Sequence, residues 1–346
     1  MSAPLRFLTL PQERRALAFE QAAATLAVAT VMVEKDFWVC WLLSLLFGDA
    51  ELDPHLVFKG GTSLSKVFGV IDRFSEDIDL SLSPAFVGAD EAAFDALRSR
   101  TRRDATLAAM QQQCGTRIRN DVAPRLEVAI TAQLGARSGG QPWLSYEDDP
   151  VAHSPLLYFH YPTAEPGGFE YLRRNVKLEL GSLTDQQPTG RHAVRPWVAD
   201  SFPAVFDDWQ CEVTALELPR TFWEKATILH AEHHRPAELP TPDRYARHYA
   251  DMARLLQHSR AAAMLSDHAL CSRVVTWKSR VFARQWARYD LARPGSFRFV
   301  PPPARVDALA RDYAQMRAMF MSEPPAFDAV LGQLTLAEQR LNGMLA

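Results

Sequence analysis

Two aspartates, Asp77 and Asp79, alternate with apolar residues in a pattern that suits metal binding. Ile78, Leu80 and Leu82 fill the other positions, so a half-buried strand would hide the apolar set and direct both carboxylates to the opposite face. Same-face neighbours on a strand lie about 6.6 to 7 Å apart. Carboxylates at that spacing can share one or two Mg²⁺ ions, which take oxygen ligands and keep places for phosphate and water.

A glycine-rich turn precedes the aspartates and has the features of a phosphate-binding turn. The segment from Leu56 to Phe58 indicates a short apolar strand, and the two glycines after it permit a positive φ and a close approach of the backbone to a ligand. We expect a helix capped by Thr62 to follow, and the backbone N–H groups at a helix start attract anions. The residues that we expect to contact phosphate are Gly60, Gly61, Thr62, Ser63 and Lys66.

The turn and the acidic strand together resemble a known family. The segment from Phe58 to Leu82, FKGGTSLSKVFGVIDRFSEDIDLSL, is similar to the signature of DNA polymerase β-type nucleotidyltransferases. Within that superfamily, the motif GGTSLSK…RFSEDIDL resembles the AbiEii/AbiGii toxin family, and the resemblance extends from about Val33 to Asn342. It implies Mg²⁺-dependent transfer of a nucleotidyl group from an NTP. The sequence has no Walker A pattern GxxxxGK[ST].

A third carboxylate usually completes such a metal site, and two strand-like segments offer one. In the first, Val176 to Leu180, Lys177 and Glu179 share one face. Glu127 has the same local pattern within Leu126 to Ile130, so the pattern alone leaves both open. The resemblance favours Glu179, because family members carry a similar KLE strand.

The C-terminal half contributes a lysine and an aspartate. Thr221 and Glu224 form a capping box, which predicts a helix start with Lys225 in its first turn. The resemblance implies that Lys225 binds the nucleotide phosphates and that Asp251 acts at the catalytic centre. From the residues alone, Asp251 would form ordinary surface ion pairs with nearby arginines. His248 replaces the first acid of the family's usual Arg-Asp-x-x-Asp pattern, so any role of that acid is in question.

Ser75 lies two residues before Asp77, on the same face if the strand extends that far back. We count it among the nucleotide-binding residues. A phosphate group on Ser75 would add about two negative charges, compete for Mg²⁺ and repel the triphosphate.

Two weaker patterns involve basic residues. The three histidines His230, His233 and His234 lack the HExxH arrangement of a zinc site, which favours ordinary helix histidines. Further on, aromatic residues alternate with arginines, and such a face either is solvated or binds RNA. The residues concerned are Trp277, Arg280, Arg284, Trp286 and Arg288.

Composition places the chain among ordinary globular proteins. The 346 residues have a net charge of -3 and are 47% hydrophobic, so no global charge indicates nucleic acid. The longest apolar run, Phe37 to Phe47, is too short to span a membrane, and Met1 to Arg15 lacks the apolar core of a secretory leader. Four widely spaced cysteines fit a reducing compartment. We therefore expect a cytoplasmic protein without a membrane partner.

The fold that we expect is α+β. A polymerase β-type nucleotidyltransferase lobe with N-terminal helices and a small mixed sheet would occupy residues 1–210, and an α-helical lobe would occupy residues 211–346. We expect a helix from Asp90 to about Gln113, a loop from Asp185 to Pro203 and a second C-terminal helix from Asp243 to about Leu256.

By resemblance, the protein is a bacterial toxin of an abortive-infection, or phage-defence, system with a separately encoded antitoxin. Its acceptor would be RNA, with the 3′ end of tRNA as the first candidate. Two alternatives stay open: a small-molecule transferase of the antibiotic-modifying kind, and a nucleotide-binding regulatory protein without catalysis.

Overall fold

The computed structural model describes residues 3–90, 94, 97, 99–148, 155–164, 173–207 and 209–344. The chain divides into two units, which we call unit 1 (Met1–Val67 and Ser75–Leu216) and unit 2 (Phe68–Phe74 and Glu217–Ala346). The sequence predicts a division after residue 210, but the last strand of the sheet continues to Leu216. The short segment 68–74 belongs with the C-terminal helices although it lies far from them in sequence.

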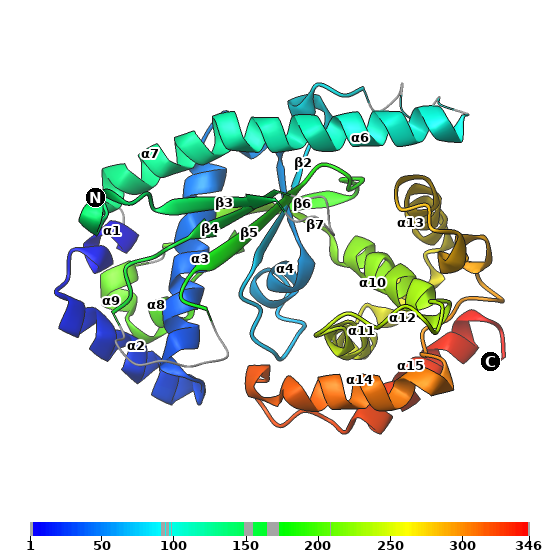
Figure 1. Ribbon diagram of the computed structural model, residues 1–346. Helices are drawn as coiled ribbons and strands as arrows, with labels where there is room; N and C mark the ends of the chain where they lie inside the picture. The colour runs from blue at the N-terminus through cyan, green and yellow to red at the C-terminus, as the bar shows by residue number, and fades with distance from the viewer. Residues whose placement is uncertain are drawn as a thin grey trace. The chain divides into compact units, whose positions relative to one another are not determined.

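In the described residues of unit 1, seven strands form one sheet in the order β3-β4-β5-β2-β1-β7-β6 (Figure 1). The pairs β1–β7 and β2–β5 are parallel and the others are antiparallel, so the sheet is mixed. This confirms the α+β fold class. The strands are β1 (Leu56–Lys59), β2 (Ile78–Leu82), β3 (Leu144–Asp148), β4 (Pro155–Phe159), β5 (Val176–Gly181), β6 (Thr189–Val194) and β7 (Cys211–Leu216).

Helices of unit 1 cover the sheet and share its core. The long apolar helix α3 is buried over most of its length, and it packs against α2 and the strands. Figure 1 shows α6 and α7 end to end, joined by one π-helical turn, Ile118–Val122. The helices are α1 (Ala3–Leu8), α2 (Gln12–Leu26), α3 (Thr30–Gly48), α4 (Gly60–Lys66), α6 (Arg100–Arg117), α7 (Ala123–Leu134), α8 (Trp197–Ser201) and α9 (Pro203–Phe206).

Taken singly, none of the described helices has the length and apolar character that crossing a membrane requires. Helices α2 and α3 meet that criterion only as a pair, with a bend of 109° between them.

The prediction of a strand at Leu126 to Ile130 is wrong, because these residues lie in helix α7. Leu126 and Ile130 are buried, but Val128 between them is 70% exposed. That burial has the helical period of i and i+4 rather than the period of two that a strand would show. The segment continues the long helical run that begins with α6.

The predicted loop from Asp185 to Pro203 is also wrong in part, since it contains β6 and α8. Strand β6, with the sequence TGRHAV, pairs with β7 at the edge of the sheet. Its residues are mostly polar and half-exposed, so it lacks the apolar alternation by which a strand is recognised. Within the helix predicted from Asp90 to about Gln113, Phe94 is helical and its N–H donates to Asp90 O at 2.9 Å, and α6 begins at Arg100. Residues 91–93, 95–96 and 98 lie outside the described part.

Unit 2 is helical, as predicted. Its apolar core includes Trp223, Tyr249, Phe297 and Leu334. The helices are α10 (Leu218–His233), α11 (Ala246–Gln257), α12 (Ala261–Ser266), α13 (His268–Val281), α14 (Pro303–Gln315) and α15 (Phe327–Leu341).

The predicted capping box at Thr221 is wrong. Helix α10 begins at Leu218, and Pro219 in its first turn suits that start because proline lacks the N–H that a helix start leaves unpaired. The Thr221 N–H instead donates to the Glu217 carbonyl, 3.1 Å away. Lys225 therefore lies in the second turn or beyond, not at the helix start.

The segment 68–74 is held in unit 2 by backbone hydrogen bonds. Phe74 N–H donates to Met319 O at 2.7 Å, and Met321 N–H donates to Asp72 O at 3.3 Å. Arg73 and Phe320 form an isolated antiparallel bridge between them. In addition, Arg254 Nη2 donates to Asp72 Oδ2 at 2.7 Å. The position of the Arg73 backbone is thus set on both sides.

Candidate active site

Acidic side chains lie opposite each other on the central strands of unit 1. In the parallel pair β2–β5, Asp79 is in register with Glu179, and in the antiparallel pair β1–β2 it is in register with Lys59. Residues in register point to the same side of a sheet. The apolar neighbours Ile78 and Leu178 are paired on the opposite, buried side. Period two thus places Asp79 and Glu179 together.

Lys177 links Asp77 to Glu179, because its ammonium contacts both carboxylates. The Lys177 Nζ lies 3.0 Å from Asp77 Oδ2 and also donates to Glu179. Burial raises the pKa of Asp77 above its ordinary value, although Lys177 opposes this shift. Burial also disfavours the ammonium, but Asp77 and Glu179 hold the pKa of Lys177 above its ordinary value. These three side chains are 25% to 37% exposed, so solvent and small ligands can reach them.

Gly60 lies directly against the Asp79 carboxylate. Its φ is +80°, and a Cβ added there would stand 1.9 Å from Asp79 Oδ2. Only glycine tolerates both the left-handed conformation and this approach. The turn that begins helix α4 therefore sets the place of Asp79.

The hydroxyl groups after the glycines stabilise the turn from within. Thr62 is buried and donates to the Asp77 carbonyl, with Ser75 Oγ 3.0 Å away. The hydroxyl of Ser63, also buried, donates to the Gly60 carbonyl at 3.0 Å. Thr62 is not the helix cap that we predicted, because α4 begins at Gly60. Any phosphate at this turn would be held by backbone N–H groups rather than by these hydroxyls.

The residues fit a magnesium ion by their chemistry. Asp77, Asp79 and Glu179 all offer carboxylate oxygens, the donors that Mg²⁺ prefers. The absence of a side chain at Gly60 leaves room for the Asp79 carboxylate itself. Across the described residues, no three His, Cys, Asp or Glu side chains converge as a ligand group by themselves, and the cation next to Asp77 and Glu179 is the Lys177 ammonium.

Three consecutive charges on helix α3 form a set of contacts that sequence reasoning missed. Lys35 donates to Glu76 and to Arg173 O, the latter at 2.9 Å. Asp36 accepts from Lys66 Nζ and from the Trp197 backbone N–H, both at 2.7 Å. The run Glu-Lys-Asp lies within an otherwise apolar, buried helix. It could have indicated these contacts, because buried charges are retained only with partners.

Lys66 forms a buried ion pair with Asp36. Its side chain is 5% exposed and is paired with Asp36, whose side chain is 2% exposed. Burial disfavours the charged lysine, but Asp36 holds the pKa of Lys66 above its ordinary value. Lys66 thus joins α4 to α3, next to the turn that we expect to bind phosphate.

In unit 2, the predicted residues Lys225 and Asp251 are in contact. Lys225 Nζ donates to Asp251 Oδ2 at 2.8 Å and lies 3.1 Å from His248 Nδ1. The other partner of Asp251 is Arg73, through Nε to Oδ1 at 2.7 Å and Nη2 to Oδ2 at 2.8 Å. Asp251 is 1% exposed, so the surface ion pairs expected from nearby arginines are wrong. Of those arginines, Arg254 pairs with Asp72 instead.

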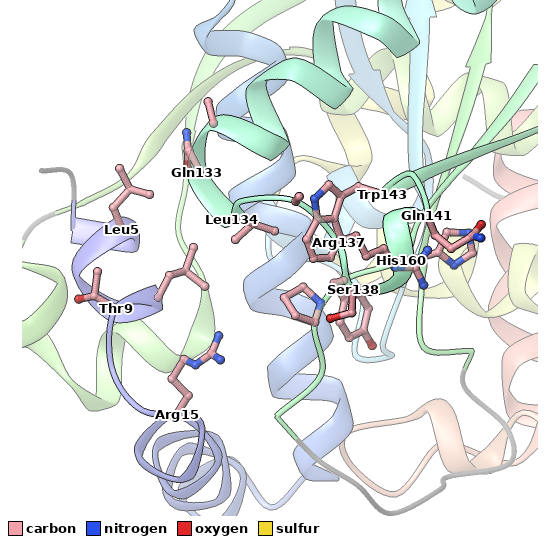
Figure 2. A pocket seen from close by; sticks show the side chains of 15 residues that line it. Leu5, Thr9, Arg15, Gln133, Leu134, Arg137, Ser138, Gln141, Trp143 and His160 are labelled. Atoms are coloured by element: carbon pink, nitrogen blue, oxygen red, sulfur yellow. The ribbon is translucent and has the colours of Figure 1, made fainter.

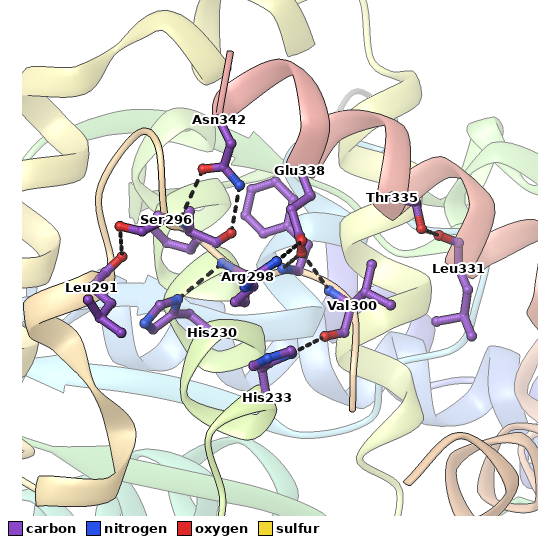
Figure 3. Close-up of polar contacts among 12 residues, drawn as sticks. His230, His233, Leu291, Ser296, Arg298, Val300, Leu331, Thr335, Glu338 and Asn342 are labelled. Atoms are coloured by element: carbon purple, nitrogen blue, oxygen red, sulfur yellow. Dashed lines mark hydrogen bonds and ion pairs between the residues drawn. The ribbon is translucent and has the colours of Figure 1, made fainter. Parts of the chain in front are cut away.

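The histidines of α10 bind backbone groups rather than metal (Figure 3). His230 Nδ1 accepts from the Arg298 N–H at 3.1 Å, so its Nε2 carries the proton and donates to Arg288 O at 3.0 Å. His233 Nδ1 lies 2.7 Å from Val300 O. Burial lowers the pKa of His230 to about 4, which keeps the ring neutral. Their role is structural.

The expected aromatic and arginine face is not a single helix, since α13 ends at Val281. Trp277 is buried, Arg284 is exposed, and Arg288 forms an ion pair with Asp290 at 3.0 Å. The residues are therefore spread over α13 and the turns that follow it.

A cavity of about 780 Å³ lies elsewhere in unit 1 (Figure 2). It is lined by α1, Arg15 of α2, the end of α7 and the segments next to β3 and β4, including Arg137 and His160. None of the proposed site residues is among the described residues that line it.

The structure separates the two candidates for the third carboxylate. Glu127 accepts from the backbone N–H groups of Trp143 and Leu144 at 2.8 and 2.9 Å, which anchors the start of β3.

We expect Glu179→Gln to lower the rate of nucleotidyl transfer at least about a hundredfold, since a metal ligand supplies several kcal/mol. Glu127→Gln should keep the transfer rate within a few-fold and destabilise the protein by about 1–3 kcal/mol. Transfer assays and thermal unfolding of both variants check this, and the reverse pattern would contradict it.

Comparison with known proteins identifies the family and the fold of the chain. A family model described as nucleotidyl transferase AbiEii toxin, type IV TA system, matches residues 41–333. Among solved structures, MenT4, a nucleotidyltransferase toxin from Mycobacterium tuberculosis H37Rv, is similar in fold, with a TM-score of 0.51 and 18% identity over 95% of this chain and 90% of that one. No curated protein sequence matches the chain. Since the family model covers most of its length, the chain belongs to the AbiEii family of nucleotidyltransferase toxins of type IV toxin–antitoxin systems.

Proposed function

We propose that this toxin transfers a nucleotidyl group from an NTP to a hydroxyl group of RNA, and that Asp77, Asp79 and Glu179 hold Mg²⁺ for the reaction. The observation that supports this most is the register of Asp79 with Glu179 on parallel strands, next to Gly60. Carboxylates on a rigid sheet beside a glycine turn suit the binding of a metal and a triphosphate.

In the proposed reaction, the oxygen of the acceptor hydroxyl forms a bond to the α-phosphorus of the NTP. The bond from the α-phosphorus to the oxygen that bridges to the β-phosphorus breaks, pyrophosphate leaves, and the hydroxyl proton passes to solvent. When bound, Mg²⁺ stabilises negative charge on the phosphate oxygens. The backbone N–H groups of Gly60, Gly61, Thr62 and Ser63 would hold the β- and γ-phosphates.

Of the two lysines expected to neutralise the phosphates, we assign this role to Lys225. Lys66 already has a buried partner in Asp36, and release of that pair would leave an uncompensated carboxylate. Lys225 lies in a cluster with more cationic than anionic groups. Ser75 stays a proposed nucleotide contact, since its hydroxyl lies beside Thr62 and two residues from Asp77.

The acceptor that we propose is RNA, with the 3′ end of tRNA as the first candidate. The test offers purified protein an NTP and three acceptors: intact tRNA, tRNA whose 3′-terminal ribose has been oxidised with periodate, and small hydroxylated antibiotics. Labelling of intact tRNA alone supports the proposal. Labelling of the antibiotics alone would identify a small-molecule transferase, and equal labelling of both tRNAs would exclude the 3′ end as acceptor.

Arginines near the end of α13 provide a second test of an RNA acceptor. Arg280→Ala together with Arg284→Ala should raise the KM for RNA about tenfold and leave the KM for NTP nearly unchanged. Each lost phosphate contact should also reduce the slope of log K against log salt by about 0.7. Arg14→Ala with Arg102→Ala removes two exposed charges from unit 1 and serves as a control. Normal RNA kinetics in the Arg280/Arg284 variant would exclude these arginines from RNA binding.

Membership of a type IV toxin–antitoxin family also implies a separately encoded antitoxin. We propose that the transfer reaction is what makes the protein toxic. Growth inhibition on expression should therefore weaken in parallel with transfer in each variant described above, and antitoxin co-expression should relieve it.

A further inference from the structure

Two cations share a single carboxylate in unit 2. Arg73 binds Asp251 in a bidentate manner, through Nε to Oδ1 at 2.7 Å and Nη2 to Oδ2 at 2.8 Å. Lys225 Nζ adds a further contact to Oδ2 at 2.8 Å. All three residues are at most 6% exposed. Bidentate pairing of arginine with a carboxylate is strong and geometrically specific, and here Arg73 shares the Asp251 carboxylate with Lys225.

The cluster therefore carries a surplus positive charge. The fourth member, His248, lies with Nδ1 3.1 Å from Lys225 Nζ, and an ammonium has no acceptor, so this ring nitrogen must accept. Burial, followed by the nearby Lys225 charge, holds the pKa of His248 well below its ordinary value, so the ring is neutral. Two cations, one anion and one neutral ring give these four side chains a net charge of +1.

Lys225 shares its carboxylate partner with Arg73. Burial lowers the pKa of Lys225, and although Asp251 opposes the shift, Arg73 competes with Lys225 for that carboxylate. Among the described residues, Lys225 has two hydrogen-bond partners, whereas an ammonium has three N–H donors. A buried cation without full compensation is unfavourable unless an anion binds to it.

Arg73 itself is placed independently of Lys225. The segment 68–74 is held by the backbone hydrogen bonds to Met319 and Met321 and by the ion pair of Asp72 with Arg254. The guanidinium can therefore orient Asp251 whether or not an anion is bound at Lys225.

We propose that Arg73 is a positioning residue: it shares the Asp251 carboxylate with Lys225, so that the charge of the Lys225 ammonium is only partly compensated and can bind the phosphates of the NTP. This rests on the proposed function. It also gives Asp251 a different role from the catalytic one implied by resemblance, since both of its oxygens are bound to cations and it acts through Lys225.

The proposal makes a prediction that a purely structural ion pair does not make. In Arg73→Met, Asp251 and Lys225 pair one to one and their charges cancel, so the Kd for an NTP should rise about tenfold or more. In Arg73→Met/Asp251→Asn, loss of the carboxylate as well restores the net charge of +1, which is now carried by Lys225, so the Kd should return towards the wild-type value. A residue that matters only for packing would give no such recovery of binding.

The experiment measures the Kd for each labelled NTP by equilibrium binding to the full-length protein, with folding checked by circular dichroism at a temperature below unfolding. Arg298→Met, which removes an arginine paired with Glu338 in the same unit, is the control and should keep the wild-type Kd. If Arg73→Met does not fold, Arg73→Lys replaces it. That variant keeps the charge but loses the bidentate geometry, and a Kd increase of a few-fold is expected.

A wild-type Kd in folded Arg73→Met or, where that variant does not fold, in folded Arg73→Lys would overturn the proposal. Failure of the double variant to bind NTP more tightly than Arg73→Met would do so as well, as would a wild-type protein that binds no NTP. Transfer is measured separately. If the wild-type protein binds NTP but transfers nothing, the proposed function fails, while the Kd values still decide the role of Arg73.

Discussion

Asp79→Asn is expected to lower the rate of nucleotidyl transfer at least about a hundredfold while the protein stays folded. The substitution keeps the size of the side chain but removes the negative charge that lies opposite Glu179 on the sheet. Metal ligation contributes several kcal/mol to the transition state, and each 1.36 kcal/mol is a factor of about ten in rate. Asp77→Asn should have an effect of the same order.

Transfer rates at saturating Mg²⁺ and NTP, together with thermal unfolding, check this expectation. Glu212→Gln is a matched control, because Glu212 is an exposed carboxylate on β7 of the same sheet. The control should retain wild-type transfer. Near-normal transfer in folded Asp79→Asn would remove the metal assignment for this residue.

Gly60→Ala is expected to reduce transfer by a similar factor and to destabilise unit 1. The new Cβ would lie 1.9 Å from Asp79 Oδ2 and 2.7 Å from Asp79 Cγ, so the carboxylate must move. The φ of +80° adds a strain of about 1–2 kcal/mol for any residue other than glycine. Displacement of a metal ligand by about 1 Å can by itself cost about a hundredfold in rate.

The control for this variant is Gly88→Ala. Gly88 also has a positive φ, +71°, but a Cβ there would meet no atom within 4 Å. Gly88→Ala should therefore show the backbone strain in its unfolding temperature and keep its transfer rate. If Gly60→Ala and Gly88→Ala have equal transfer rates, the close approach of Gly60 to Asp79 has no catalytic importance.

Period-two alternation was sufficient to predict strands β2 and β5 and the face that carries Asp79 and Glu179. Such a pattern is local, and strong apolar alternation leaves little choice of backbone. The register that brings Asp79 opposite Glu179 could not be predicted, because strand pairing depends on contacts between residues 100 positions apart. The same alternation wrongly predicted a strand at Glu127, where a helix continues from α6 through α7.

Arg73 shows why the rest of the site was not accessible from the sequence. Its partner Asp251 is 178 residues away, and arginines closer to Asp251 in sequence were the expected partners. Only the inclusion of segment 68–74 in unit 2 brings Arg73 to Asp251. Likewise, the pairing of Asp36 with Lys66 joins α3 to α4 across 30 residues of sequence, and no local motif predicts which charges meet.

The central claim, transfer of a nucleotidyl group, is tested most directly by comparing α-³²P-labelled with γ-³²P-labelled NTP in reactions with purified protein, Mg²⁺ and total RNA. The proposed reaction predicts that the α label becomes covalently attached to RNA, that the γ label is released as pyrophosphate, and that Asp79→Asn abolishes both. Attachment of the γ label, or labelled RNA that is equally abundant with Asp79→Asn, would contradict it.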